Sequence, residues 1–357
     1  MSAEAARKYH FETGVYRPPS EGGSHSLLVR VTRNCPWNRC AFCNMYKHEK
    51  FSLRSPEEVK ADIDSMAAIC NGLKRFSEEL GNAGEINRDA AIAMINQDPM
   101  LNTSQGFVMI YNWLLSGGKT AFLQDANSLI MKTDQLVDIL KYLRKTFPSL
   151  NRVTSYSRSK TLAQKKLEAL QAIHNAGLDR LHVGLETGND ELLKKIKKGV
   201  TAEGHIKAGK KVMQAGFELS EYWMPGLGGK AMWQAHARNT ARVLNEINPH
   251  YIRSRPFFPV PGTPLFEAHE SGDYQPLSPQ GQLRELKLMM EELEVTSKVC
   301  FDHAANWWIG KNGGLLLTHS YEGYKFPEQK SHLLQLIDEG IKVQEDNPTD
   351  PGFRIHL

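Results

Sequence analysis

The chain of 357 residues has only five cysteines, an odd number, and no long apolar run. Such a cysteine count, without regular spacing, does not build a disulfide framework and is typical of a reducing compartment. No stretch approaches the roughly 20 apolar residues that a membrane span needs. The first ten residues also lack the apolar core of a secretory signal. We therefore expect a cytoplasmic protein that has no membrane partner.

The sequence also lacks a strong excess of charge of one sign. Its 44 Lys and Arg residues against 40 Asp and Glu residues leave a net charge of +4. Nucleic-acid-binding proteins usually concentrate basic residues in a patch, and the lysines of 194–198 recur at a spacing that favours an exposed helix face instead. Nucleic acid is thus an unlikely partner, although this balance permits an anionic substrate.

Strand and helix patterns alternate through the middle of the chain. Apolar or alternating runs bounded by turn residues predict six strands, most of them separated by a helix. The predicted strands are 25–32, 120–124, 152–156, 180–186, 217–224 and 251–257. This order is typical of parallel β/α units and predicts an α/β fold.

Several other segments complete the expected organisation. We expect an N-terminal arm over 1–24, a core domain over 25–265 with a helical insertion at 72–119, and a C-terminal extension over 266–357. Ser55 and Glu58 predict a capping box at one helix start, and Thr161 predicts another for a helix over 161–175. The extension carries expected helices at 279–298 and 328–343, with an aromatic loop between them.

Polar residues lie at or just beyond the ends of the predicted strands. They are the cysteine segment after the first strand, Asp125, Ser157, Glu186 and Arg255. Since parallel strands direct their C-terminal ends to the same edge, we expect these residues to gather on one rim.

Three of the five cysteines, Cys35, Cys40 and Cys43, lie on one short segment. Three thiolates can bind three irons of a [4Fe–4S] cluster and leave the fourth iron open, whereas an electron carrier uses four cysteines per cluster. An open iron favours an enzyme. The alternative is a zinc site of three cysteines and one histidine, for which His48 is the nearest candidate. Cys70 and Cys300 are expected to be small buried residues.

These motifs resemble the radical S-adenosylmethionine (SAM) superfamily. The cysteine spacing of four residues and then two is longer than the usual three and two, and is similar to that of the elongator and methylthiotransferase branch. Further similar motifs are Val-Gly-Leu-Glu-Thr-Gly at 183–188, Met-Pro-Gly-Leu-Gly-Gly at 224–229 and Pro-Gly-Thr-Pro-Leu at 261–265. The resemblance covers about residues 25–265 and implies a partial (β/α)6 TIM-like barrel.

The resemblance also implies the cofactors and their contacts. The [4Fe–4S] cluster would bind SAM and cleave it reductively to a 5′-deoxyadenosyl radical, the cofactor supplying the difficult chemistry. Phe42 would lie by the adenine, although packing over the cluster is equally compatible. Asp125 would replace the acidic residue that binds the SAM ammonium, or would be a turn or N-cap residue.

Three further residues are expected to contact SAM. Glu186 would bind the ribose or the amino-acid part, with a structural ion pair to Arg158 or Arg255 as the alternative. Arg255 is preferred to Arg253 as a carboxylate ligand, unless their shared face is solvated. Ser157, on the same expected rim, completes the predicted cofactor-binding set.

The predicted function is therefore that of a radical SAM enzyme acting on an unidentified substrate, a small molecule or a peptide. An electron donor such as flavodoxin or ferredoxin is the expected protein partner. The alternatives are a tRNA-modifying radical SAM enzyme and a non-catalytic iron–sulfur or zinc protein. The residues that act on the substrate are not identified by the sequence.

Overall fold

The computed structural model describes residues 8–15 and 25–346. It divides into two compact units. The first comprises Met1–Pro36, Glu49–Ser157 and Lys166–Leu181, and the second comprises Trp37–His48, Arg158–Lys165 and His182–Leu357. Within the described ranges, no helix is both long and apolar enough to cross a membrane.

The first unit contains three buried parallel strands, β1 (Leu27–Arg30), β4 (Thr120–Gln124) and β5 (Arg152–Ser157). They lie in the order β1-β4-β5, and the register pairs Leu27 with Ala121 and Thr120 with Arg152. The largely apolar sequences of β1 and β4 are typical of parallel sheets covered on both faces. A short antiparallel pair, β2 (Thr32–Arg33) and β3 (Ser52–Leu53), flanks the cysteine segment.

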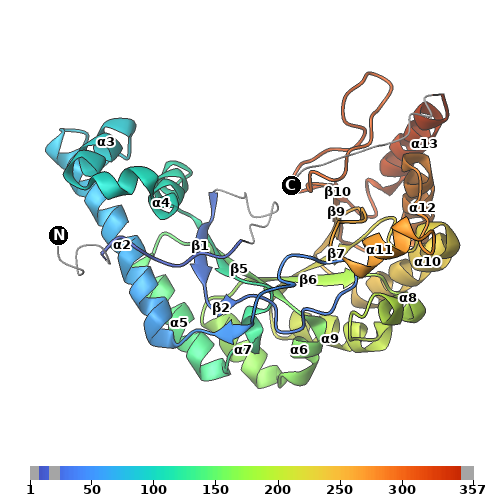
Figure 1. Cartoon of the computed structure of the whole chain (residues 1–357), viewed down its shortest axis with the longest axis horizontal. Coiled ribbons are helices and arrows are strands. Elements are labelled where there is room, and N and C mark those ends of the chain that lie inside the picture. The colour runs from blue at the N-terminus through green and yellow to red at the C-terminus, as the bar shows by residue number, and fades with distance from the viewer. Residues whose placement is uncertain (1–7, 16–24, 347–357) are drawn as a thin grey trace. The chain divides into compact units, whose positions relative to one another are not determined.

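Helices cover the strands of the first unit. They are α2 (Pro56–Glu79), α3 (Arg88–Gln97), η3 (Pro99–Thr103), α4 (Gln105–Leu115), η4 (Ser128–Ile130), α5 (Thr133–Thr146) and α7 (Leu167–Asn175). Helix α2 begins with the expected capping box of Ser55 and Glu58 and packs along α5 (Figure 1). It continues to Glu79, so the broken helical segment expected from residue 72 begins after this helix.

The strands of the second unit lie in the order β6-β7-β8-β9-β10. They are β6 (Arg180–Glu186, its first two residues in the first unit), β7 (Glu218–Trp223), β8 (Tyr251–Ser254), β9 (Lys298–Cys300) and β10 (Tyr324–Lys325). Strand β8 runs parallel to both β7 and β9, and β10 is antiparallel to β9.

The helices of the second unit connect and cover these strands. They are α6 (Ser159–Gln164), α8 (Asp190–Lys195), α9 (Ala202–Gln214), α10 (Gly229–Ile247), α11 (Pro264–Glu270), α12 (Pro279–Glu292) and α13 (Lys330–Asp346). Helix α10 contacts α9 and α12, and α12 also contacts α13 (Figure 1).

The predicted α/β class is confirmed, and each of the six expected strands is present. Three details of the prediction are wrong. Strand 251–257 is not the last, because β9 and β10 follow it, and the helix expected over 279–298 ends at Glu292. The helix expected over 161–175 is divided into α6 and α7, and Thr161 lies inside α6 rather than capping it. Arg158 is the N-cap residue of α6, without a side-chain cap.

Part of the expected N-terminal arm packs against the first unit. Phe11 is buried, and the backbone of Gly14 exchanges two hydrogen bonds with the Gln124 side chain, at 2.8 and 3.0 Å. Glu12 forms ion pairs with Arg30 and Arg33, both at 2.7 Å. The remainder of the arm lies outside the described residues.

Candidate functional site

The cysteine segment joins β2 to β3, beyond the end of β1. Asn34 and Asn38 have positive φ angles of 66° and 45°, a conformation that asparagine tolerates better than most residues. Cys35, Cys40 and Cys43 form no disulfide and are half-buried. Three cysteine thiols are the donor set that an iron–sulfur cluster with one open iron requires.

Within residues 8–15 and 25–346, no three His, Cys, Asp or Glu side chains are arranged to hold a single metal ion, and this finding includes Cys35, Cys40 and Cys43. His48, the fourth ligand in the zinc alternative, is exposed. Cys70 and Cys300 are buried as expected, and burial raises the pKa of each thiol to about 12.

The second unit fastens the cysteine segment to the turn that follows α8. Trp37 Nε1 donates a hydrogen bond to the Lys197 carbonyl at 2.8 Å, and the Ala41 amide donates one to the Ile196 carbonyl at 2.9 Å. The Trp37 ring also lies so close to Gly199 that a Cβ there would be 2.4 Å from it. Gly199 has a φ of +76°, so both its backbone conformation and this close approach require glycine.

Phe42 is half-buried and packs against an apolar cluster of the second unit. The buried members of this cluster are Ala41, Leu192, Ile196, Met224, Leu227, Phe257, Leu265 and Tyr274. The Lys198 ammonium lies 5.9 Å from the Phe42 ring centre. Both interpretations of Phe42, contact with adenine and packing over the iron–sulfur cluster, stay predictions.

Glu186 ends β6 in a strained backbone conformation. Its φ is 62°, and the Thr187 amide donates to the Leu185 carbonyl across it at 2.8 Å, which forms a tight three-residue turn. The Glu186 carboxylate accepts a hydrogen bond from the Lys198 ammonium at 2.6 Å. A Cβ at Gly184 would lie 2.1 Å from Glu186 Oε1 and 3.0 Å from Lys198 Nζ, so this ion pair fills the space above Gly184.

A buried histidine supports the turn at Glu186. His236 Nε2 donates to the Met224 carbonyl at 3.0 Å, and His236 Nδ1 accepts from the Thr187 hydroxyl at 2.7 Å. Burial lowers the pKa of His236 to about 4, which keeps the ring neutral and compatible with this pattern. The Met224 amide in turn donates to the Glu186 carbonyl at 3.0 Å. Strain at a well-supported position is characteristic of functional sites.

Lys198 is a residue that the sequence analysis missed. The lysines of 194–198 were expected to form an exposed face, and Lys194, Lys195 and Lys197 are indeed exposed, but Lys198 is only 9% exposed. Its ion pair with Glu186 also supplies the cationic partner that was expected from an arginine. Nothing in a run of lysines distinguishes the one that the following turn directs inward.

Asp125 directly follows β4 and is completely buried in the first unit. Its Oδ2 accepts hydrogen bonds from Arg30 Nε and Nη2 at 3.0 and 2.8 Å and from the Asn34 amide at 2.8 Å. Oδ1 is buried without a hydrogen-bond partner among the described residues. A Cβ at Gly14 would be 1.9 Å from Oδ1, so the N-terminal segment lies directly against this carboxylate.

Ser157 ends β5, and its hydroxyl donates to Asn127 Oδ1 at 3.1 Å within the first unit. Because β4 and β5 are parallel, Asp125 and Ser157 lie at the same edge of their sheet. The expected rim is thus present in this unit.

In the second unit, Arg253 is fully buried rather than solvated. It forms a 2.8 Å ion pair with Asp302, and the rings of Tyr251 and Tyr321 lie 4.9 and 4.5 Å from its guanidinium. These contacts indicate that Arg253 has a structural role.

Arg255 lies beyond the end of β8 and is half-buried. Its charge, together with burial as the larger cause, lowers the pKa of His303 to about 4. The C-terminal extension is tied to this strand end, since Asn306 exchanges hydrogen bonds with Ser254 at 2.7 and 2.9 Å. The extension therefore contributes to the surroundings of Arg255.

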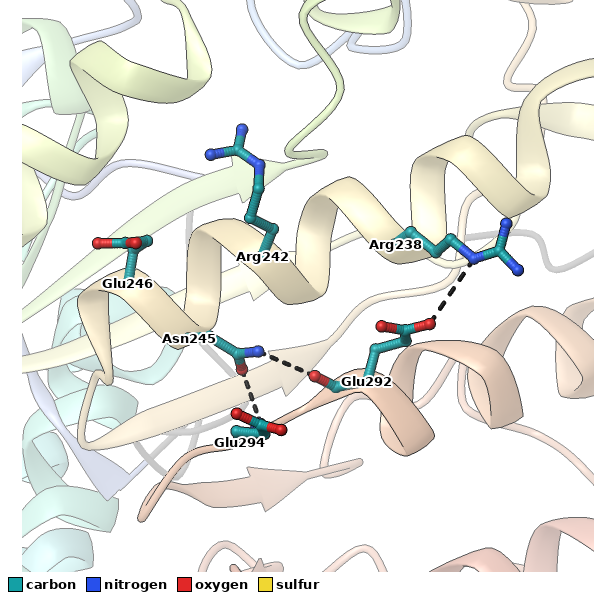
Figure 2. Close-up of a pocket in the computed structure, with 6 residues that line it drawn as sticks. All are labelled: Arg238, Arg242, Asn245, Glu246, Glu292 and Glu294. Atoms are coloured by element: carbon teal, nitrogen blue, oxygen red, sulfur yellow. Dashed lines mark hydrogen bonds and ion pairs between the residues drawn. The ribbon is translucent and has the colours of Figure 1, made fainter.

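A surface pocket on α10 and the end of α12 contains none of the predicted site residues (Figure 2). Arg238 Nε lies 3.7 Å from a Glu292 carboxylate oxygen, and the Asn245 side chain bonds to the backbone of Glu292 and Glu294. It has no thiol and does not fit a cluster.

Part of the chain matches known proteins. Residues 112–236 match the family profile of the radical SAM superfamily, a range that begins after the cysteine segment and includes β4 to β7. A tRNA uridine(34) acetyltransferase of Methanocaldococcus jannaschii is 30% identical over 101 residues, 28% of this chain and 19% of that protein. The chain therefore spans about a fifth of the length of that relative.

Two solved structures share features of the chain at low identity. Methylornithine synthase has a TM-score of 0.44 at 17% identity, covering 77% of this chain and 66% of its own. An archaeal Elp3 of Methanocaldococcus infernus has a TM-score of 0.44 at 14% identity, covering 73% and 59%. The family match confirms the prediction of an enzyme of this superfamily. Residues 112–236, about a third of the chain, therefore match the radical SAM superfamily.

Proposed function

We propose that this protein binds a [4Fe–4S] cluster through Cys35, Cys40 and Cys43 and uses it to cleave SAM reductively, producing a 5′-deoxyadenosyl radical that acts on a substrate still to be identified. The observation that carries the proposal is the set of three half-buried cysteines, none in a disulfide, on one segment of a chain with a radical SAM family match. Bound in this way, the cluster supplies one electron to the SAM sulfonium.

The residues of the chain would bind and orient SAM. Glu186, held in its strained turn beside Lys198, is the best supported ligand for the ribose or amino-acid part of SAM. Phe42 would border the adenine. Asp125, Ser157 and Arg255 remain proposed contacts, and Asp125 would have to share its carboxylate with Arg30.

The reducing electron would come from a small donor protein such as a flavodoxin or ferredoxin. Free thiols at the proposed cluster site and at Cys70 and Cys300 are compatible with a reducing, cytoplasmic environment. The substrate would be a small molecule or a peptide.

Modification of tRNA is a second candidate function. It is favoured by one specific observation, the 30% identity to a tRNA uridine(34) acetyltransferase over 101 residues. Since the match covers 19% of that relative, acetyl transfer is not part of the proposal. This candidate is tested by measuring the binding of unmodified tRNA at increasing salt concentrations, with a tRNA-free sample as the control.

The main proposal is tested by anaerobic reconstitution with iron and sulfide, followed by dithionite and SAM. We expect about four irons per chain and release of 5′-deoxyadenosine. Cys40→Ala should lose both, while Cys70→Ala, a matched loss of one thiol, should retain both. Production of 5′-deoxyadenosine by Cys40→Ala, or stoichiometric zinc in place of iron, would overturn the proposal.

A further inference from the structure

The turn after α8 contains the buried Lys198 and also contacts the cysteine segment. Ile196 and Lys197 accept hydrogen bonds from Ala41 and Trp37, and Gly199 packs against the Trp37 ring. In the chain, Lys198 follows the first two of these contact residues and precedes the third. Its position relative to the segment that carries Cys40 and Cys43 is therefore fixed by the backbone as well as by its side chain.

An arginine strengthens this arrangement. Arg158 Nη2 donates to the Lys198 carbonyl at 2.6 Å, and its guanidinium lies 4.7 Å from the Trp37 ring centre. Arg158 and Trp37 thus bind the carbonyls of two successive residues, Lys198 and Lys197. Contacts of this kind fix the direction in which the Lys198 side chain leaves the turn.

Two neighbouring groups define the position of the Lys198 ammonium. It is 2.6 Å from Glu186 Oε1 and 5.9 Å from the ring centre of Phe42, the residue between Cys40 and Cys43 along the segment. Burial disfavours the charge, but the Glu186 carboxylate and the Cys40 thiolate outweigh it and raise the pKa of Lys198 above its usual value. Lys198 therefore stays cationic.

The cysteine segment is fixed beside this charge, because the amide of Ala41, the residue after Cys40, donates to the Ile196 carbonyl at 2.9 Å. A charge that is only 9% exposed is weakly screened by solvent.

We propose that Lys198 is a positioning residue whose buried positive charge, set by Glu186, Trp37 and Arg158, raises the reduction potential of the cluster bound by Cys40 and its two companions. The inference rests on the proposed function. The step concerned is addition of one electron from the external donor protein to the oxidised cluster, which lowers the charge of the cluster by one. A nearby cation stabilises the more negative product, and a nearby carboxylate destabilises it.

The test compares four charge variants in an EPR-monitored redox titration of the anaerobically reconstituted protein. Lys198→Met should shift the midpoint to a more negative potential, by an amount that changes the ratio of reduced to oxidised cluster on the order of tenfold at a fixed potential. Glu186→Gln should shift it to a more positive potential. Lys198→Arg, which keeps the charge, should stay near the unsubstituted protein. Lys194→Met, an exposed lysine of the same run, is the matched control and should leave the midpoint unchanged.

A purely structural role would not produce shifts of opposite sign from the two members of one ion pair. Shifts of the same sign, or no shift in Lys198→Met, would overturn the inference. If Lys198→Met does not retain iron, Trp37→Phe decides instead: it keeps the aromatic ring but loses the bond to the Lys197 carbonyl, and should give a smaller negative shift. An unchanged midpoint there would also contradict the inference.

The two proposals fail in different ways. If the unsubstituted protein does not assemble an iron–sulfur cluster or release 5′-deoxyadenosine, the proposed function fails. If it does both and its midpoint is insensitive to the charge of residue 198, only the role of Lys198 fails.

Discussion

Two carboxylates, Asp125 and Glu186, lie at the C-terminal ends of strands and look equivalent in the sequence, yet the structure surrounds them differently. Asp125 is completely buried, binds Arg30 and the Asn34 amide, and has the backbone of Gly14 against it. Glu186 has a strained backbone, is not completely buried, and its carboxylate forms an ion pair with Lys198.

Asp125 organises its own unit, whereas Glu186 is the carboxylate that we propose as a ligand of SAM. Burial with strong internal partners gives Asp125 a large structural contribution, because removing one member of a buried pair leaves the other charge uncompensated. Strain at Glu186 costs folding free energy and is retained only where surrounding bonds support it. We therefore expect stability to depend mainly on Asp125, and SAM binding mainly on Glu186.

The largest expected effect is on stability, from Asp125→Ala. It removes the acceptor for Arg30 and the Asn34 amide and should lower the free energy of unfolding by about 3 kcal/mol. Urea denaturation of the purified protein measures the change. Asp134→Ala, at an exposed carboxylate in the first turn of α5, is the control and should cost less than about 1 kcal/mol. Equal losses in the two variants would contradict a structural role for Asp125.

The next effect concerns pH and the loop that supports Glu186. Burial raises the pKa of Glu285 to about 8, although the Gly226 amide donates to its carboxylate at 2.5 Å. Because this folded-state pKa lies above the ordinary value of 4.5, the folded protein binds the proton more tightly. The resulting stability is complete below about pH 4.5 and is lost as the pH rises to about 8.

Glu285→Gln should flatten this dependence and, at pH 9, exceed the unsubstituted protein in unfolding free energy by a few kcal/mol, on the order that such a shift implies. Urea titrations at pH 5, 7 and 9 test it, with the exposed Glu270→Gln as control. Hydrogen exchange locates the effect. Exchange rates are compared with the intrinsic base-catalysed rate at each pH. The protection of the Met224 amide, bonded to Glu186, should fall at high pH, whereas that of the Asn34 amide, bonded to Asp125, should not. A loss of protection at Asn34 alone would contradict this assignment.

Features that depend on neighbouring residues could be predicted from the sequence, whereas features that depend on packing between distant segments could not. Strand order and the capping box at Ser55 depend on neighbouring residues, and both are confirmed. The positions of Asp125 and Glu186 at strand ends followed from the same patterns. Their partners did not, because Arg30 and Lys198 are brought to them by packing between segments far apart in the sequence.

Other differences have the same origin. The short strands β9 and β10 have only three and two residues, too few for an alternating pattern, and they depend on pairing with β8. Thr161 has the sequence of a helix cap, but the helix begins earlier, at Ser159. Contact of Phe11 and Gly14 with the first unit was also hidden, since a short polar segment carries little periodic signal.

A steric probe at Gly184 sharpens the comparison further. Gly184→Ala places a methyl group 2.1 Å from Glu186 Oε1 and should separate Glu186 from Lys198, at a cost of about 1 to 3 kcal/mol. Gly314→Ala is the matched control, because a Cβ there meets no atom within 4 Å and its φ is not positive. Urea unfolding and equilibrium SAM binding are measured for both. Unchanged SAM affinity in a folded Gly184→Ala protein would argue against this ion pair as part of the binding site.

The smallest expected effect on stability comes from Glu186→Gln, which keeps the shape of the side chain and a hydrogen-bond acceptor for Lys198. The unfolding free energy should change by about 1 kcal/mol or less, because the amide oxygen still accepts a hydrogen bond from Lys198 and the strained turn is held by backbone bonds. Affinity of the reconstituted protein for SAM should nevertheless fall by roughly tenfold, the loss expected for one charge-assisted hydrogen bond. Isothermal titration under anaerobic conditions measures it, with Glu203→Gln, an exposed carboxylate in the first turn of α9, as control. If Glu186→Gln instead destabilises the fold as much as Asp125→Ala and binds SAM normally, the two carboxylates have the same structural role and the distinction between them is wrong.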